Sequence, residues 1–214
     1  MIHCLYADEL KAYPLLAETM FKDRAFQFRD RLNWDVTVDE DGQERDQYDA
    51  LNPMYLIWQD PQGRHAGSIR LMPTMGRTMT AEHFLDCTDG VRISSPLIWE
   101  CTRFCLAPGA SPAVAGGLMA MGIEIGLRSG LEQALGVIYT RVLGLYRRAG
   151  HVPDIIGTKG EGREKISVCI WNVTEEARDQ LCRHSGIPTE LIQSWYDASF
   201  PSRFPSEERQ LAVA

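Results

Sequence analysis

The segment Ile98-Trp99-Glu100-Cys101-Thr102-Arg103-Phe104-Cys105-Leu106 is rich in β-forming residues and predicts a strand near the middle of the chain. Residues 112–131 follow Pro108 and Gly109, are rich in Ala, Met, Leu and Ile, and predict a largely buried helix. Residues 136–140 predict the next strand. A strand, a helix and a further strand in this order indicate an α/β domain with a mixed sheet.

Further elements are predicted on both sides of this central unit. Residues 55–59 and 67–71 predict two strands joined by a hairpin turn near Gly63, and an acidic loop of residues 34–49 precedes them. We expect one catalytic domain over residues 1–200 and a polar C-terminal tail over residues 201–214. The other predicted elements are an edge strand at 2–6, a helix from Asp8 past Phe28, a helix at 142–149 closed by Gly150, a strand at 166–173, and helices at 175–184 and 189–196.

The composition favours a globular cytoplasmic protein. The chain has 214 residues, of which 44% are apolar, and this length suits one domain with a substantial core. Its apolar runs are too short for a membrane span, and Asp8 and Glu9 stand where a secretory signal needs positive charge. The six cysteines form no CxxC pair, so they are expected to be reduced thiols.

Several function classes lack their signatures in this sequence. The net charge of −7 argues against a nucleic-acid binder, because phosphate contacts need a surplus of Lys and Arg. Phosphate-binding loops of the GxGxxG and GKS/T types are missing, as are the GxSxG and HExxH motifs. The five histidines are scattered, so we expect no metal site and no cofactor.

Charged and aromatic residues interrupt the apolar patterns in the N-terminal third. Arg24, Phe28 and Trp34 stand at the end of the first helix, where they could bind a carboxylate together with an adenine or a sulfonium. They could equally be a helix end with core aromatics. Asp46 and Asp49 could hold an ammonium group, although any acidic loop contains such residues.

Opposite charges inside the central strand raise the same question. Burial of Glu100 and Arg103 is costly unless they are paired, so they form either a structural ion pair or part of a site at the sheet face. Arg70 stands in a similar position in another predicted strand. In an ideal strand Glu100 and Arg103 point to opposite faces, and a β-bulge or strong twist near Cys101 would reconcile them.

Taken together, Arg24-x-x-x-Phe28, Trp34, Asp46-x-x-Asp49, Arg70 and Glu100-x-Thr102-Arg103-Phe104 resemble the acyl-homoserine-lactone synthase family, the LuxI-type autoinducer synthases. Order and spacing agree over residues 20–105, and the later half matches less sharply. The resemblance implies a three-layer α-β-α fold like that of N-acetyltransferases, with a twisted mixed sheet split by a cleft. It also implies two substrates, S-adenosylmethionine and an acyl group delivered as a thioester on acyl carrier protein or coenzyme A. The expected product is a quorum-sensing signal.

The resemblance also suggests roles for these residues. Glu100 is the candidate base that takes the proton from the amine of S-adenosylmethionine. Arg24 and Arg103 would hold the substrate carboxylate and Asp46 its ammonium. Phe28 and Trp34 would enclose the adenosyl and sulfonium end of the substrate, and Phe104 also belongs to the expected binding residues. Asp49, Arg70 and Thr102 would organise the site. We expect a contact between Asp49 and Arg70 to hold the acidic loop against the sheet.

The second half of the chain supplies candidates for the acyl pocket and for the carrier. The apolar side chains could line the acyl pocket, or they could be ordinary core residues. A cationic cluster could attract an acidic carrier protein, or it could be an ordinary solvent-exposed helix face. The pocket candidates are Leu118, Met119, Ile123, Tyr139, Thr140, Leu143 and Trp171, and the docking candidates are Arg141, Arg147 and Arg148.

Two rival functions remain open on the sequence. One is a coenzyme A-dependent N-acyltransferase of N-acetyltransferase type, although residues 109–117 are a poor match to its glycine-rich pyrophosphate turn. The other is a non-catalytic small-molecule sensor. The sequence leaves open the length, branching and oxidation of the acyl chain, the choice of carrier, and the oligomeric state.

Overall fold

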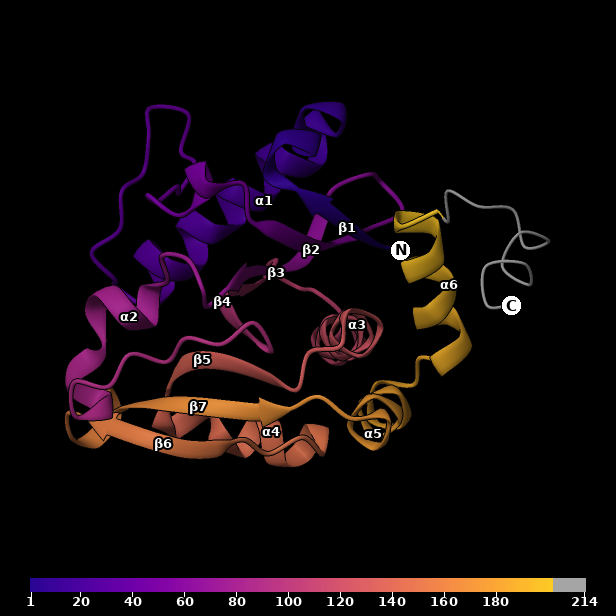
Figure 1. Ribbon diagram of the computed structural model, residues 1–214. Helices are drawn as coiled ribbons and strands as arrows, with labels where there is room; N and C mark the ends of the chain where they lie inside the picture. Colours follow the sequence, from indigo (N-terminus) through magenta and orange to yellow (C-terminus); the bar gives the residue numbers. More distant parts are fainter. Residues whose placement is uncertain (202–214) are drawn as a thin grey trace.

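The strand that carries Glu100 and Arg103, β4 (Ile98–Leu106), lies in the middle of a seven-stranded sheet (Figure 1). The computed structural model describes residues 1–201, so residues 202–214 of the predicted tail lie outside the described part. The other strands are β1 (Ile2–Tyr6), β2 (Met54–Gln59), β3 (His65–Pro73), β5 (Gln133–Tyr139), β6 (Asp154–Lys159) and β7 (Ile166–Asn172). The helices are α1 (Pro14–Ala25), α2 (Met79–His83), α3 (Pro112–Ser129), α4 (Leu143–Ala149), α5 (Glu175–Ser185) and α6 (Thr189–Ser199).

The sheet divides at the boundary between β4 and β5. The strand order is β1-β2-β3-β4-β5-β7-β6, and every neighbouring pair is antiparallel except β4 and β5. These two strands are parallel, so the chain must cross over between them, and α3 is the crossover helix. Their ladder pairs only residues 98–100 with 133–135, so the two strands separate beyond Glu100.

Alternating side chains on β2 show how helices cover both faces of the sheet. Leu56 belongs to the core beneath α3, α5 and α6, whereas Tyr55 and Ile57 belong to a second core beneath α1. Because both faces of the same strand are covered, the fold has three layers, helix, sheet and helix (Figure 1). This arrangement confirms the predicted fold class.

The region beyond β4 is covered by less regular structure. Cys87 belongs to a 3₁₀ turn, Leu85–Thr88, and packs on Leu135 and Val168 of β5 and β7. On the opposite face of these strands, Tyr146 of α4 packs against Trp171 of β7, with ring centroids 5.1 Å apart. Within residues 1–201, no helix is both long and apolar enough to cross a membrane.

Two elements were not predicted, and two predicted helices have other bounds. The edge strand β6 is mostly exposed and contains Gly157, so it lacks the alternation that identifies a strand, and α2 is only one turn long. The helix predicted from Asp8 begins as a 3₁₀ turn, Ala7–Ala12, and α1 starts at Pro14, whose fixed φ suits a first helical position. Helix α3 ends before Gly130, which adopts a φ of +69°.

Candidate active site

Three arginines from different elements converge on carboxylates of the acidic loop between α1 and β2. The arginines come from the end of α1, from β3 and from β4, which places them on the sheet face that α1 covers. The arginines are Arg24, Arg70 and Arg103, and the carboxylates are Glu44, Asp46 and Asp49.

Arg24 is completely buried, and all of its nitrogens have carboxylate partners. Its Nε donates to Glu44 Oε2 at 2.6 Å. Its Nη1 and Nη2 donate to the two oxygens of Asp49 at 3.1 and 3.0 Å, which is the bidentate geometry of a strong guanidinium–carboxylate pair. Arg24 therefore joins α1 to the acidic loop at two residues, Glu44 and Asp49.

Arg70 joins the same loop to the sheet. Its Nε donates to the Thr102 hydroxyl on β4 at 2.9 Å. Its Nη2 donates to Asp46 Oδ2 at 2.8 Å, and its Nη1 donates to Asp49 Oδ1 at 2.7 Å. Because Arg70 is also fully buried, movement of the loop away from the sheet would leave the Arg70 charge buried without its carboxylate partners.

The arginines favour the ionised forms of Asp46 and Asp49. Burial alone would raise the pKa of the Asp49 carboxyl, but Arg24 and Arg70 outweigh burial and hold this pKa well below its usual range. The pKa of Asp46 is lowered for the same reason by Arg70 and Arg103, again against the effect of burial. Burial and the Asp49 carboxylate raise the pKa of Tyr55, whose hydroxyl donates to Asp49.

A β-bulge brings Arg103 to this group. Ser68 and Arg70 of β3 pair with Cys105 and Thr102 of β4, so β4 contains one extra residue between these pairs. Arg103 adopts a φ of +52°, a left-handed conformation that costs a non-glycine residue about 1–3 kcal/mol. Its side chain consequently lies on the same face as Glu100, and its Nη2 is 3.0 Å from Glu44 Oε1 and 2.9 Å from Asp46 Oδ2. The bulge lies two to three residues after Cys101.

Two stacked aromatic rings lie beside Arg103. Phe28 is buried in a π-helical turn, Phe26–Arg31, that continues α1, and such turns are frequent at functional sites. The Arg103 guanidinium lies over the Phe28 ring at 5.2 Å, and Phe28 stacks on Trp34 with centroids 5.0 Å apart and an angle of 17°. The Trp34 Nε1–H donates to the Tyr139 hydroxyl at 2.7 Å.

Glu100 faces the start of α2. Its carboxylate is fully buried and accepts hydrogen bonds from the backbone amides of Met79 at 2.9 Å and Thr80 at 2.6 Å. Glu100 thus satisfies two of the amides that a helix N-terminus leaves without partners. Thr102 lies beside Arg70, as described above, whereas Phe104 packs against the core beneath α3 and lies apart from the group.

Comparison with known proteins decides the family. A family model described as autoinducer synthase matches residues 9–181. The chain belongs to the autoinducer synthase family. It is 39% identical to an acyl-homoserine-lactone synthase of Rhizobium etli over 183 residues, which cover 82% of this chain and 86% of that protein. An isovaleryl-homoserine lactone synthase of Bradyrhizobium diazoefficiens is 32% identical over 160 residues, covering 73% of this chain and 72% of that one.

Solved structures agree with this family. The coenzyme A-dependent acyl-homoserine lactone synthase MesI superimposes with a TM-score of 0.78 at 27% identity, covering 88% of this chain and 96% of that one. BjaI, solved with S-adenosylmethionine and isopentyl-coenzyme A, gives the same TM-score and identity, covering 88% and 90%. An acyl-coenzyme A N-acyltransferase of Pseudomonas aeruginosa shares the fold, with a TM-score of 0.53 at 13% identity, covering 79% and 98%. The chain is therefore an acyltransferase that makes an acyl-homoserine lactone.

The residues predicted to line the acyl pocket of this synthase lie on α3, on or just after β5, on β7, and at the start of α4. Leu118 and Ile123 of α3 are buried in the core, and Met119 packs against that core. Trp171 lies near Gly136 and the Cys101 carbonyl, where β4 and β5 separate. The other three candidates belong to the end of β5 and to α4: Tyr139 contacts Trp34, Thr140 shares a hydrogen bond with Ser167 at 2.8 Å, and Leu143 begins α4.

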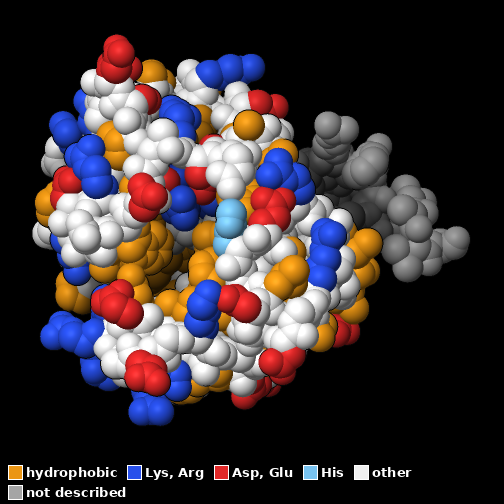
Figure 2. Space-filling model, turned by 90° about the vertical axis from the view of Figure 1, so that its left-hand side faces the viewer, with side chains coloured by type: hydrophobic (Ala, Val, Ile, Leu, Met, Phe, Trp, Pro, Cys, Tyr) orange, Lys and Arg blue, Asp and Glu red, His pale blue; other side chains and the backbone are white. Residues whose placement is uncertain are grey.

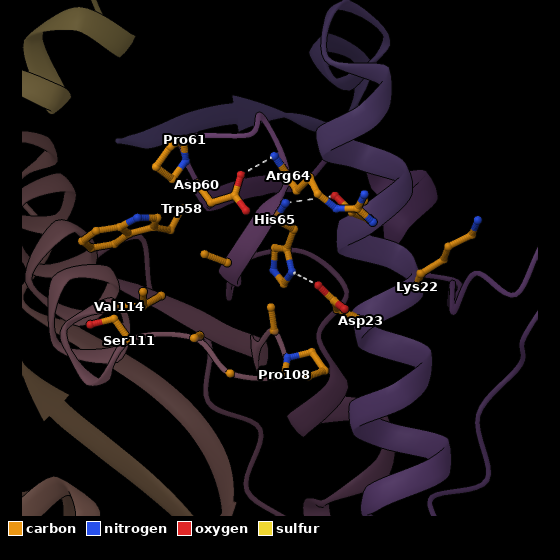
Figure 3. A pocket seen from close by; sticks show the side chains of 15 residues that line it. Lys22, Asp23, Trp58, Asp60, Pro61, Arg64, His65, Pro108, Ser111 and Val114 are labelled. Carbon is orange, nitrogen blue, oxygen red and sulfur yellow. Dashed lines mark hydrogen bonds and ion pairs between the residues drawn. The ribbon is translucent and has the colours of Figure 1, made fainter.

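A cavity of about 470 Å³ lies elsewhere in the synthase (Figure 3). It is bounded by α1, by the β2–β3 hairpin and by the loop before α3, and its lining includes none of the predicted site residues. Figure 3 shows His65 at its edge, with Nδ1 2.7 Å from Asp23 Oδ2. Its Nε2 is 3.0 Å from the Ser68 hydroxyl. Both ring nitrogens therefore have partners within the protein.

Sequence reasoning missed Glu44, which links Arg24 to Arg103. The residue lies two positions before Asp46 in the acidic loop, where its pattern is that of a solvent-exposed carboxylate. The isolated bridge between Val38 and Glu44 turns the loop back on itself and buries this side chain completely. Among residues 1–201, no group of three or more His, Cys, Asp or Glu side chains is arranged to hold a metal ion.

We predict that Asp49→Asn destabilises the protein at pH 7 by about 3–5 kcal/mol, the usual cost of removing one partner of a buried ion pair, because Arg24 and Arg70 each lose one of two carboxylates. The pKa of Asp49 is lowered in the folded state, so its contribution is complete above the unfolded pKa of about 4 and is lost as the pH falls below that value. Thermal unfolding followed by circular dichroism at pH 7, 5 and 3 should therefore show a difference in Tm between wild type and variant that narrows towards pH 3.

The matched control for this prediction is Asp154→Asn, which changes an exposed aspartate at the start of β6. We expect the control to unfold with the wild-type Tm at each pH. An Asp49→Asn variant as stable as wild type at pH 7 would show that the buried ion pairs do not hold the acidic loop.

Proposed function

We propose that this synthase acylates the amine of S-adenosylmethionine with an acyl thioester and then closes the lactone, releasing methylthioadenosine. The observation that carries the proposal is the unequal use of the three arginines. Arg24 and Arg70 donate to protein acceptors from each of their nitrogens. Arg103 Nη1, by contrast, makes its one hydrogen bond within residues 1–201 to the sulfur of Met79 at 3.9 Å, and a thioether sulfur is a weak acceptor.

This difference supports a proposal in which Arg103 binds the substrate carboxylate and Arg24 and Arg70 hold the surrounding framework. A carboxylate placed beside Arg103 Nη1 would also lie near the Phe28 and Trp34 rings, which suit the sulfonium and adenine of the same molecule. Asp46 remains beside Arg103 as an acceptor for the ammonium group. The sequence hypothesis gave Arg24 a share in carboxylate binding, but we do not retain it in the proposal, because the Arg24 guanidinium is fully buried and each of its nitrogens already donates to a protein carboxylate.

The chemistry has two steps. In the first, the deprotonated amine attacks the thioester carbonyl, the C–S bond breaks, and the thiolate leaves and takes up a proton. In the second, a carboxylate oxygen attacks the carbon next to the sulfonium, and the electrons of the broken C–S bond go to methylthioadenosine. The second step depends mainly on bringing the carboxylate to that carbon, so a pocket that holds both ends of the molecule supplies much of the rate.

The gap between β4 and β5 is our proposed route for the acyl chain. Beyond Glu100 the two strands no longer pair, and Gly136 adds no side chain beside the Cys101 carbonyl and the Trp171 ring. Figure 2 shows a hollow with hydrophobic side chains on the face at the left of Figure 1. Burial raises the pKa of the Cys101 thiol to about 12 and that of the Cys169 thiol to about 11, so neither thiol ionises at neutral pH.

Purified protein incubated with S-adenosylmethionine and a panel of acyl thioesters on coenzyme A and on acyl carrier protein tests the reaction. We expect mass spectrometry to detect an acyl-homoserine lactone and an equal amount of methylthioadenosine. Acylated product without methylthioadenosine would indicate a plain N-acyltransferase. Binding of S-adenosylmethionine without any product would indicate a sensor, and either result would overturn the proposal.

Variants of Glu100 and Arg103 should fail in different ways in this assay. As the proposed base, Glu100 contributes to the amine's proton transfer, so Glu100→Gln should lower kcat by about 10²–10⁴-fold while changing the KM for S-adenosylmethionine little. Arg103→Lys loses the planar fork and should mainly raise that KM. A wild-type kcat in Glu100→Gln would contradict the role of Glu100 as the base. Its role would then be limited to the hydrogen bonds that it accepts from the start of α2.

We propose that the exposed arginines of α4 attract an acidic carrier protein. Arg147 and Arg148 lie in the last turn of α4 and are exposed on a protein with a net charge of −7. Arg141 is less available, because its side chain lies over the Tyr139 ring and 3.5 Å from a Glu164 carboxylate oxygen. Leu145 and Val152, each 54% exposed, add apolar surface at and just beyond the same helix.

The double variant Arg147→Ala/Arg148→Ala should raise the KM for acyl carrier protein thioesters several-fold, and the effect should shrink as salt is added. The same acyl group on N-acetylcysteamine, which has neither carrier nor phosphate, should keep its KM. Arg183→Ala, at an exposed arginine in the last turn of α5, is the matched control. An unchanged KM for the carrier would remove docking from the role of α4.

A further inference from the structure

Five side chains form a continuous series of contacts across the gap between β4 and β5. The series begins at Arg103, which lies over Phe28, and Phe28 stacks on Trp34. Trp34 and Tyr139 follow with ring centroids 5.9 Å apart at an angle of 56°, and the Arg141 guanidinium lies 3.9 Å from the centre of the Tyr139 ring. Trp34 and Tyr139 are also joined by the hydrogen bond of 2.7 Å.

The position of Tyr139 in β5 determines the face to which it belongs. Glu100 pairs with Leu135, so these two residues share a face, and alternation puts Tyr139 on that same face. Gly136 lies on the other face, where it pairs with Cys169 and approaches Trp171. The sequence-based grouping of Tyr139 with Trp171 as acyl-pocket residues therefore joins side chains from opposite faces of the sheet.

We propose that Tyr139 is a positioning residue for S-adenosylmethionine, acting by holding Trp34 in place. This inference rests on the proposed function of the site and adds to it a residue from the second half of the chain. The Tyr139 hydroxyl accepts the indole N–H of Trp34, and Trp34 forms one wall of the pocket for the adenosyl and sulfonium end.

The loop that carries Trp34 explains why such support is needed. Residues 33–37 pair with no strand, and the Trp34 side chain is only half-buried. An indole can only donate, so it needs an acceptor to fix its direction, and the Tyr139 oxygen is one. Arg141 lies over the Tyr139 ring and limits its movement in turn.

The variant Tyr139→Phe keeps the ring and its contacts but removes the acceptor. Trp34 would then donate to water, so we expect a loss the size of one net hydrogen bond, about three- to tenfold in affinity. Titration calorimetry with S-adenosylmethionine alone should show Kd raised by this factor, and the KM for S-adenosylmethionine should rise equally. The KM for the acyl donor, kcat, and the distribution of acyl products from a mixed donor pool should stay at wild-type values.

A double-mutant cycle with Trp34→Phe tests whether Tyr139 acts through Trp34. In the Trp34→Phe background, Tyr139→Phe should change the Kd no further. Tyr13→Phe, at a tyrosine that packs near His3 far from the gap, is the matched control and should bind S-adenosylmethionine as wild type does. Thermal unfolding of each variant checks that Tyr139→Phe keeps the wild-type Tm.

Three results would overturn the inference. One is unchanged S-adenosylmethionine binding in Tyr139→Phe. Another is a shift in the acyl products with that binding intact, which would return Tyr139 to the acyl pocket. The third is equal loss from Tyr139→Phe with and without Trp34. All three require that wild type binds S-adenosylmethionine, so failure of the wild type to bind it identifies failure of the proposed function instead.

Discussion

Burying three guanidinium groups side by side is the constraint on which this site depends. Each charge loses its hydration on entering the protein interior, at a cost of several kcal/mol, and the cost is offset only by close carboxylates with good geometry. The acidic loop supplies three carboxylates, and each of them contacts two of the arginines: Glu44, Asp46 and Asp49. The arginine charges are therefore neutralised only when the loop folds onto the sheet. This requirement fixes the position of a loop that has little regular secondary structure.

The three arginines differ in how strongly the described residues hold them. Arg24 and Arg70 connect α1, β3 and the loop through hydrogen bonds that use each of their nitrogens. Arg103 is held in a left-handed conformation by a bulge, and its position depends on the framework around it. Strain of this kind persists where surrounding contacts determine the conformation, and it is common at ligand sites. Arg24, Arg70 and the loop thus hold in place Arg103, the arginine that we propose contacts the substrate.

The sequence predicted the central strand, the crossover helix and most of the residues that gather on one sheet face. These features depend on local patterns and on the cost of burying Glu100, Arg70 and Arg103, which can be judged from neighbouring residues. Glu44 was missed because its burial depends on a turn in the acidic loop, and nothing in its neighbours signals this. Tyr139 was grouped with Trp171, which points to the opposite face of the sheet, because residue type indicates what a side chain can contact but not the face on which it lies.

The even balance of three cations and three anions also limits how such a protein can change over time. Loss of any one of these residues leaves an uncompensated charge in the low-dielectric interior. A substitution in this group therefore needs a second, compensating substitution. Apolar residues near the gap between β4 and β5 have no charged partner to compensate, so each can be replaced singly by another apolar residue of similar volume. With the acyl chain in the gap, as proposed, single mutations can change the acyl group of the signal, whereas the charged residues of the proposed nucleotide site can change only together.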